Sequence, residues 1–425
     1  MSREAIVVSG VGVLTPIGHD VAAFTDALRA AKCGIVAVAA DDAPSGSRLF
    51  APLGQFDVTA ALDAIGLDEK TRTRALRTAR RSPLPVQAAL VAAAQAWHDA
   101  QLSQRPVPSD RIGLVVGGHN LTTAAASTAS GRGPAYVPPR FALQAQDTDH
   151  IGTLSQALGI TGEGCTVGAS SASGNLALIH AARLIGFDAV DVCLAVGAMT
   201  QLGSLERGAL ANLGVLADID TDLSTDLVEA APIGGCRPFD KGRSGLVPGE
   251  AAACVVLESE LSALRRGVPI SVELSGFKLA LDGNSLSNPS IDGEVRAIAG
   301  ALARSRLEPR EIGYVNAHGT GTPAGDDAEL AALESVFGDA VAVPWVNSTK
   351  ALIGHTLSAA GAVEAVATVV QMKGGFVHGN PVLDHPVSDR HRFVGAEAQA
   401  AEIAHALSNS FGFGGFNTSV LFSRC

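Results

Sequence analysis

The sequence predicts an α/β fold, because short apolar segments typical of buried strands alternate with longer segments of helical pattern along the whole chain. The 425 residues suit two domains or one large duplicated α/β unit with an ample core. Hydrophobic residues make up 47% of the chain and charged residues only 17%, so most of it is expected to be packed. The 47 glycines indicate many tight turns and close backbone contacts.

The first half opens with residues 5–13 (AIVVSGVGV), which predict a buried strand. Residues 84–101 predict an alanine-rich helix with a proline in its first turn, where proline is tolerated. Two further buried strands are expected over 113–118 and 188–198. The stretch at 120–136 is expected to be a loop that forms a channel wall.

The second half predicts the same alternation and closes with a hairpin. Its order is strand and loop, helix, strand, helix and two final strands, over residues 312–319, 325–338, 340–348, 358–373, 406–410 and 418–423. Residues 40–48, in the first half, are a second candidate loop.

Two similar segments hint at duplicated halves. SASGNLAL (171–178) and SAAGAVEA (358–365) both open an apolar helix after a turn of small residues. The halves would join near residues 255–270, and we predict an N-terminal half over 1–255 and a C-terminal half over 256–425. A chance match explains so short a similarity as well as duplication does.

Composition and charge exclude several classes of protein. The formal net charge of −11 argues against nucleic acid as a general partner. No apolar run reaches about 18 residues, so no membrane span is expected, and the N-terminus lacks the pattern of a signal peptide, which predicts a cytoplasmic protein. The six cysteines are scattered without a C-x-x-C pair, so we expect neither a metal site nor a disulfide framework.

The most informative segment is 165–185 (CTVGASSASGNLALIHAARLI), a turn of small residues followed by an apolar helical pattern. It places Ser171 at a helix N-terminus, where free N–H groups and the helix dipole stabilise negative charge. His318 and His355 lie much later, in loops rich in glycine and threonine, with Lys350 between them. This combination is similar to that of acyl-thioester enzymes.

Six motifs in one order resemble those of type II elongating β-ketoacyl-acyl carrier protein synthases. They are VVSGVGVLTPIG (7–18), the segment 165–185, RPFDKGRSGLVPGEAA (237–252), NAHGTGTPAGD (316–326), NSTKALIGHTLSAAGAVE (347–364) and NSFGFGGFN (409–417). Each alone is a weak signal, but together they extend over nearly the whole chain. The resemblance implies a thiolase-like five-layer αβαβα fold with two pseudo-duplicated halves, a homodimer, and an acyl carrier protein as partner whose phosphopantetheine carries the substrate, with no other cofactor.

The resemblance implies that His318 and His355 donate hydrogen bonds to a thioester carbonyl and stabilise the enolate left when carbon dioxide departs. It also implies that Thr320 and Thr322 bond the phosphopantetheine arm. The alternatives are histidines bonded to their own backbone and threonines that only cap the loop. The acidic residues of 325–329 are expected to cap and brace a helix.

Two further pairs take roles from the same resemblance. Lys350 and Glu364 are expected to form an ion pair that orients the histidines, with a purely structural salt bridge as the alternative. Phe413 resembles a gating phenylalanine whose N–H would join that of Ser171 in an oxyanion hole. The family usually has threonine at the position of Phe416, so the pocket nearby is expected to differ in shape.

Ser171 stands where the condensing enzymes carry cysteine. A thiol has a pKa of about 8.5, which falls at a helix N-terminus, so cysteine offers thiolate near neutral pH. A serine hydroxyl ionises far above that range and needs a general base to attack a thioester. Acyl loading, with which condensation begins, should therefore be slow, whereas loss of carbon dioxide from a malonyl thioester needs no nucleophile.

The string GASSASGN resembles one subgroup in particular, the free-standing decarboxylases of polyketide β-branching cassettes, which convert malonyl-carrier protein to acetyl-carrier protein. Decarboxylation is thus the first hypothesis. The second is a condensing synthase that uses serine slowly, or in which serine was introduced for cysteine as a trap. The third is a non-enzymatic subunit like a chain-length factor, paired with an active synthase.

A basic segment, KTRTRALRTARR (70–81), stands out in this acidic chain. Arg77, Arg80 and Arg81 resemble the family's docking patch for acyl carrier proteins, which are acidic and would be steered by a local positive patch. A solvated helix face is the alternative interpretation.

Overall fold

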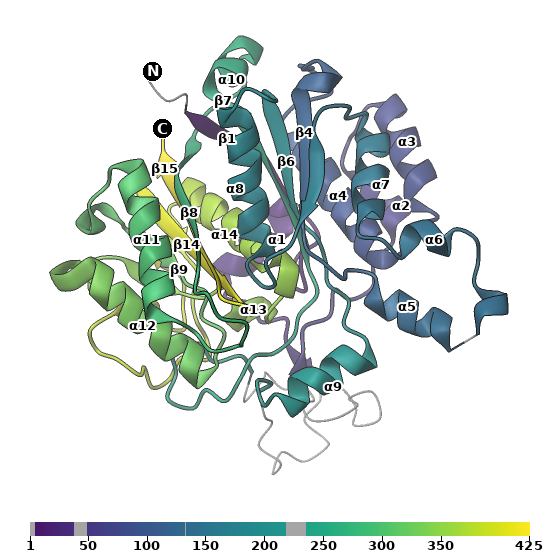
Figure 1. Ribbon diagram of the computed structural model, residues 1–425. Helices are drawn as coiled ribbons and strands as arrows, with labels where there is room; N and C mark the ends of the chain where they lie inside the picture. Colours follow the sequence, from purple (N-terminus) through teal and green to yellow (C-terminus); the bar gives the residue numbers. More distant parts are fainter. Residues whose placement is uncertain (1–4, 38–48, 132, 218–234) are drawn as a thin grey trace.

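The strands of the computed structural model form a mixed sheet with the order β12-β10-β9-β14-β15-β8-β1-β7-β6-β4-β5 (Figure 1). The structure describes residues 5–37, 49–131, 133–217 and 235–425. The candidate loop at 40–48 lies outside these residues. None of the helices described is both long and apolar enough to cross a membrane.

The N-terminal half supplies five strands of this sheet and most of the helices. Its strands are β1 (Ile6–Leu14), β4 (Ile112–Gly117), β5 (Gly164–Val167), β6 (Val192–Gly197) and β7 (Ala252–Ser259). Its helices are α1 (Val21–Arg29), α2 (Val58–Ala64), α3 (Glu69–Ala79), α4 (Leu84–Asp99), α5 (Thr123–Ser130), α6 (Phe141–Gln144), α7 (Thr148–Leu158), α8 (Ser173–Gly186), α9 (Ser204–Asn212) and α10 (Glu260–Arg266).

The C-terminal half supplies the other six strands. They are β8 (Val272–Leu281), β9 (Tyr314–Asn316), β10 (Trp345–Asn347), β12 (Arg392–Phe393), β14 (His405–Gly412) and β15 (Phe416–Arg424). Its helices are α11 (Ile291–Ser305), α12 (Pro323–Phe337), α13 (Lys350–Ile353) and α14 (Ala360–Gly374). Two small ribbons lie apart, β2 (Val36–Ala37) with β3 (Leu49–Phe50), and β11 (Phe376–Val377) with β13 (Gln399–Ala400).

The strand order repeats itself across the junction of the halves. The order β1-β7-β6-β4-β5 is matched by β8-β15-β14-β9-β10, with antiparallel pairs next to the junction and parallel pairs beyond them. The halves meet where Val7 of β1 pairs with Glu273 of β8. This repetition supports the predicted duplication. Strand β7 crosses the predicted boundary after residue 255, so the strand order favours a junction between Ser259 and Val272, where α10 lies.

The helices complete five layers, as Figure 1 shows from right to left. Helix α4 packs on β1 and β7, α8 and α14 lie between the two halves of the sheet, and α11 packs on β8 and β15 with α12 beside it. The central helix α14 is buried along almost its whole length, which explains its nearly uninterrupted apolar sequence. The expected αβαβα arrangement is confirmed.

Glycines let backbones approach at two places in this core. A Cβ on Gly12 of β1 would lie 2.1 Å from the carbonyl oxygen of Ala92, so the glycines of the VVSGVGV motif allow α4 to pack directly on the strand. Helices α8 and α14 touch in the same way. A Cβ on Gly174 would lie 2.4 Å from the amide nitrogen of Ala362, and one on Gly361 would lie 2.6 Å from that of Asn175.

The pair Gly174 and Gly361 occupies equivalent positions in the two similar segments, 171–178 and 358–365. The similarity therefore has a structural basis: it marks the helices that cross at the centre of the molecule.

Three predictions of local structure need correction. The expected loop at 120–136 contains α5 and a 3₁₀ turn, because its alanines favour a helix. The expected strand at 340–348 is only β10, preceded by a 3₁₀ turn over 338–340. The expected strand at 188–198 begins at Val192, after a turn in which Asp188 has a positive φ of 57°.

Candidate active site

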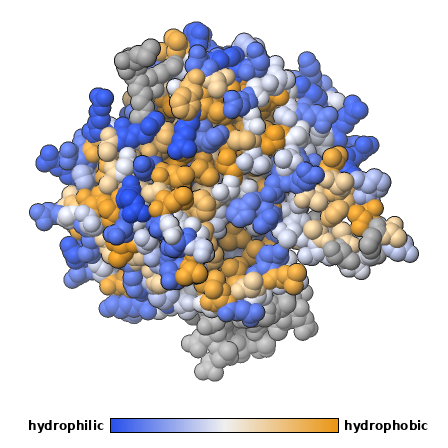
Figure 2. All heavy atoms as spheres, viewed as in Figure 1, coloured by the Kyte–Doolittle hydropathy of each residue, from blue (hydrophilic) through white to orange (hydrophobic). Residues whose placement is uncertain are grey.

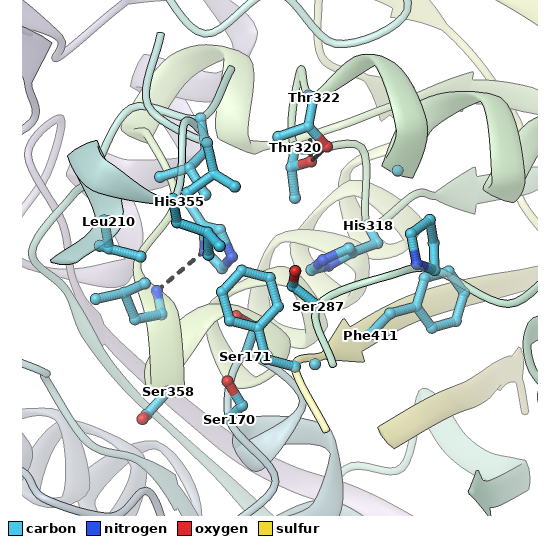
Figure 3. A pocket seen from close by; sticks show the side chains of 18 of the residues that line it. Ser170, Ser171, Leu210, Ser287, His318, Thr320, Thr322, His355, Ser358 and Phe411 are labelled. Carbon is cyan, nitrogen blue, oxygen red and sulfur yellow. Dashed lines mark hydrogen bonds between the residues drawn. The ribbon is translucent and has the colours of Figure 1, made fainter. Parts of the chain in front are cut away.

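Residues at the carboxyl ends of the parallel strands gather around one cavity of about 590 Å³. Ser171 follows β5, His318 follows β9, His355 follows β10 and Phe413 follows β14, and all four line it. Parallel strands place such loops at one edge of the sheet, where ligands commonly bind. Figure 2 shows hydrophobic side chains around a hollow on this face. In Figure 3, His318 and His355 point toward each other above Ser171.

Ser171 lies in a tight turn that leads into α8. Ser170 has a positive φ of 51°, and the Ser173 hydroxyl secures the turn by donating to the Ser170 carbonyl at 2.6 Å and accepting the Ala169 N–H at 2.9 Å. The helix begins at Ser173, so the predicted placement of Ser171 beside a helix N-terminus is confirmed. Among the described residues, no side chain accepts a hydrogen bond from the Ser171 hydroxyl.

His355 is held in a fixed orientation by backbone groups. Its N–H donates to the Val247 carbonyl at 2.6 Å, and its own carbonyl accepts from Gly249. The Leu357 N–H donates to Nδ1 of the imidazole at 3.1 Å. A neutral imidazole that accepts at Nδ1 carries its proton on Nε2, so the Nε2–H of His355 is the ring's remaining donor.

His318 reaches the same protonation pattern through Lys350. The Lys350 ammonium donates to the His318 carbonyl oxygen at 2.6 Å and lies 3.4 Å from Nδ1 of the ring. An ammonium group has no acceptor, so Nδ1 must accept and Nε2 carries the proton. The expected ion pair between Lys350 and Glu364 is present, and both side chains are buried.

Both imidazoles are neutral at pH 7. Burial and the positive charge of Lys350 hold the pKa of His318 and that of His355 well below the usual value of 6.5. The ring centroids lie 5.6 Å apart at an angle of 85°. The cavity therefore contains two neutral Nε2–H donors that can converge on one oxygen atom.

Buried carboxylates of α12 support the loop that carries His318. Glu329 accepts the N–H groups of His318 at 2.9 Å and Gly319 at 2.8 Å, and Asp326 accepts that of Gly321 at 3.0 Å. These acids were expected to cap and brace a helix, but Asp326 and Glu329 instead accept hydrogen bonds from the loop that carries His318. The sequence did contain a signal for this role: Asp326 and Glu329 are three residues apart, on one face of a helix that directly follows the His318 loop.

The remaining predicted residues line the cavity or its rim. The hydroxyls of Thr320 and Thr322 lie 2.8 Å apart and both residues line the cavity, which leaves the phosphopantetheine role a prediction. Phe413, in the turn between β14 and β15, is 41% exposed at the rim. Phe411, which sequence reasoning missed, packs edge-on against His318 with ring centroids 5.4 Å apart.

The predicted docking residues lie outside the cavity. Arg77 is in the last turn of α3, and Arg80 and Arg81 follow that helix, all three exposed. The side chain of Gln144 in α6 donates to the Arg81 carbonyl at 2.6 Å, so the patch adjoins the arm formed by α5 and α6. Among the described residues, no group of three or more histidine, cysteine, aspartate or glutamate side chains could hold a metal ion.

Comparison with protein families decides the classification. The N-terminal domain of β-ketoacyl synthases matches residues 3–263, and the C-terminal domain of the same enzymes matches residues 272–384. The chain belongs to the β-ketoacyl synthase family. The gap between the two matches coincides with the junction inferred from the strand order.

Named relatives of this β-ketoacyl synthase cover nearly its whole length. It is 37% identical over 418 residues, 98% of this chain and 95% of the relative, to a protein named polyketide biosynthesis malonyl-ACP decarboxylase PksF from Bacillus subtilis. It is 33% identical over 436 residues to 3-oxoacyl-[acyl-carrier-protein] synthase 2 of Vibrio harveyi, covering 100% of this chain and 99% of that one.

Solved structures of other family members share the fold. The ishigamide ketosynthase/chain length factor superposes with a TM-score of 0.86 at 26% identity, over 99% of both chains. A β-ketoacyl synthase from Burkholderia phymatum superposes with a TM-score of 0.83 at 28% identity, over 99% of this chain and 100% of that one. The thiolase-like fold expected from the sequence is confirmed.

Proposed function

We propose that this β-ketoacyl synthase converts malonyl-acyl carrier protein to acetyl-acyl carrier protein, as a decarboxylase in polyketide β-branching. One observation carries the proposal. Two neutral Nε2–H donors converge in a cavity where, among the described residues, no side chain accepts a hydrogen bond from the Ser171 hydroxyl. The name of the relative from Bacillus subtilis, a malonyl-ACP decarboxylase, supports the same reaction.

The geometry accounts for the loss of carbon dioxide. The thioester carbonyl oxygen of the malonyl group accepts hydrogen bonds from Nε2–H of His318 and Nε2–H of His355. As the carbon–carbon bond breaks, its electron pair forms an enolate, and negative charge collects on that oxygen. Donors fixed in advance and shielded from water stabilise this charge more than the uncharged ground state. The enolate carbon then takes a proton, which gives the acetyl thioester.

The other predicted residues serve this step. Thr320 and Thr322 would bond the phosphopantetheine arm, and the amides of Ser171 and Phe413 would form a second set of donors, with the Phe413 ring at the entrance. The steps use only groups of this chain and the phosphopantetheine of the carrier protein. A condensing synthase remains the second candidate, favoured by the relatives named 3-oxoacyl synthases.

Intact-mass analysis of the protein with malonyl-carrier protein alone tests the proposal. We expect acetyl-carrier protein to form without a stable acyl group on Ser171, and the Ser171→Ala variant to keep most of the wild-type rate. Ser171→Cys should gain an acyl adduct from acyl-carrier protein, because a thiol at this helix N-terminus ionises readily. Turnover that requires an acyl primer would favour condensation, and activity only with a second synthase would favour a partner subunit.

We also propose a homodimer in the cytoplasm. In the described residues, β5 is an edge strand paired only with β4, and Tyr136 and Leu143 of the neighbouring arm are 78% and 66% exposed. Light scattering should give twice the chain mass of 43.1 kDa. Tyr136→Asp should shift the measured mass toward that of a monomer. A monomeric wild-type protein would contradict the proposal. All six cysteines are free, which suits a reducing compartment.

A further inference from the structure

The first turn of α11 brings a buried carboxyl group to the wall of the same cavity. Glu294 is 1% exposed and lines the cavity together with His318 and Phe411. Its Oε2 atom has no hydrogen-bond partner among the described residues. A buried carboxyl oxygen without a partner is costly, so its presence in a reaction cavity calls for a function.

The surroundings of Glu294 favour its neutral form. Burial, Glu329 of α12 and Asp282 after β8 raise its pKa to about 10. Arg296, two residues further along α11, lies 3.7 Å from Asp282, and no ion pair of Glu294 itself occurs among the described residues. The group is therefore a carboxylic acid at pH 7, able to donate a proton into the cavity.

Its two acidic neighbours, Asp282 and Glu329, accept hydrogen bonds from other groups. Asp282 accepts a hydrogen bond from the Asn417 amide at 2.8 Å, and Glu329 accepts the two backbone N–H groups described above and the Asn409 amide at 3.1 Å. The oxygen atoms of both neighbours are thus engaged by these donors, whereas Oε2 of Glu294 has no partner among the described residues. Glu294 is therefore the acid of this cluster that is free to donate into the cavity.

We propose that Glu294 is the general acid that protonates the enolate carbon after carbon dioxide has left. The O–H bond of the carboxylic acid breaks as a new C–H bond forms at the enolate carbon, whose electron pair came from the broken carbon–carbon bond. The products are the acetyl thioester and the Glu294 carboxylate, which regains its proton from water. This inference rests on the proposed function.

The other polar groups of the cavity suit this step less well. Nε2–H of His318 and of His355 is needed on the enolate oxygen, and a neutral imidazole is a far weaker acid than a carboxylic acid. The hydroxyl of Ser171 is also a weak acid. A separate acid lets the histidines hold the oxygen while the carbon takes its proton.

Pre-steady-state kinetics of Glu294→Gln with an excess of malonyl-carrier protein test this role. Glutamine resembles the neutral acid in size and polarity, so the variant should fold, which its thermal unfolding would verify. In the wild type, carbon dioxide and acetyl-carrier protein should form together. In the variant, we expect carbon dioxide to appear first, in an amount equal to the enzyme, and acetyl-carrier protein to follow about 100-fold more slowly.

Two further variants make the test specific. Asp292→Asn removes an exposed carboxyl from the same helical turn and should leave both rates within about twofold of the wild type. Glu294→Ala leaves room for a small acid, so added formate should restore acetyl formation there and not in Glu294→Gln.

The outcomes separate the acid role from a structural one and from the proposed function itself. Equal slowing of carbon dioxide and acetyl formation in Glu294→Gln without rescue of Glu294→Ala, or a wild-type rate in Glu294→Gln, would overturn the role of Glu294. A wild-type protein that releases no carbon dioxide from malonyl-carrier protein would instead overturn the proposed function.

Discussion

The Lys350 ammonium group donates to the backbone carbonyl of His318 at 2.6 Å and lies 3.4 Å from Nδ1 of the same residue's ring. One side chain thus positions the loop that carries His318 and also determines which ring nitrogen bears the proton. The buried carboxylate of Glu364 balances the charge of Lys350. This relationship makes stability and catalysis depend on Lys350 in different ways.

Replacing Lys350 by methionine should lower both the free energy of unfolding and the rate of decarboxylation. The variant leaves Glu364 buried without its cation, and breaking a buried pair costs about 3–5 kcal/mol of unfolding free energy. The double variant Lys350→Met with Glu364→Gln should regain most of that stability in urea unfolding, yet remain as poor a decarboxylase as the single variant. Recovery of activity in the double variant would show that Lys350 acts only through stability.

Removing either imidazole should remove one donor from the enolate oxygen. His318→Ala and His355→Ala are each expected to lower kcat for carbon dioxide release by about 10²–10³-fold, the usual effect of losing one such donor. His405→Gln is the control, since it changes a half-buried histidine at the opposite end of β14 and should stay within twofold. Unchanged kcat in His318→Ala would remove this residue from the mechanism.

The pH dependence follows from the lowered pKa values of the two histidines. A histidine of ordinary pKa 6.5 would be about three quarters protonated at pH 6 and would lose the acceptor at Nδ1. Because burial and Lys350 hold both pKa values well below 6.5, the rings stay neutral as the pH falls, and kcat should remain level from pH 8 to pH 6. Measurement of kcat at saturating malonyl-carrier protein checks this, and a fall centred near pH 6.5 would contradict it.

Carrier-protein docking can be tested with one matched pair of charge reversals. Arg80→Glu should raise KM for malonyl-carrier protein about fivefold at low salt, since one exposed charge pair contributes at most about 1 kcal/mol. The effect should shrink as ionic strength rises, while kcat stays constant. Arg310→Glu makes the same charge change at an exposed position of the C-terminal half, and an equal rise in KM there would reject a specific patch.

Local sequence predicted the parts of the site that lie within one segment. The turn before α8, the glycine-rich loops of His318 and His355, and the pair Lys350 and Glu364 all carry local patterns. Glu294 could not be found in this way, because packing of α11 on β8 and β15 decides that it is buried and faces the cavity. The segment 120–136 was misjudged because its serines and threonines outweighed its alanines, which have the highest helix propensity.

The contact between Gly174 and Gly361 has a consequence for how such a protein can change. Ser171 lies three residues before one of these glycines and Ser358 three residues before the other, and both serines border the cavity. A methyl group on either glycine would push the two crossing helices apart and separate Ser171 from the histidines. The geometry of the site in each half therefore depends on a glycine in the other half. A substitution at either glycine can be tolerated only if both helices shift to make room for it.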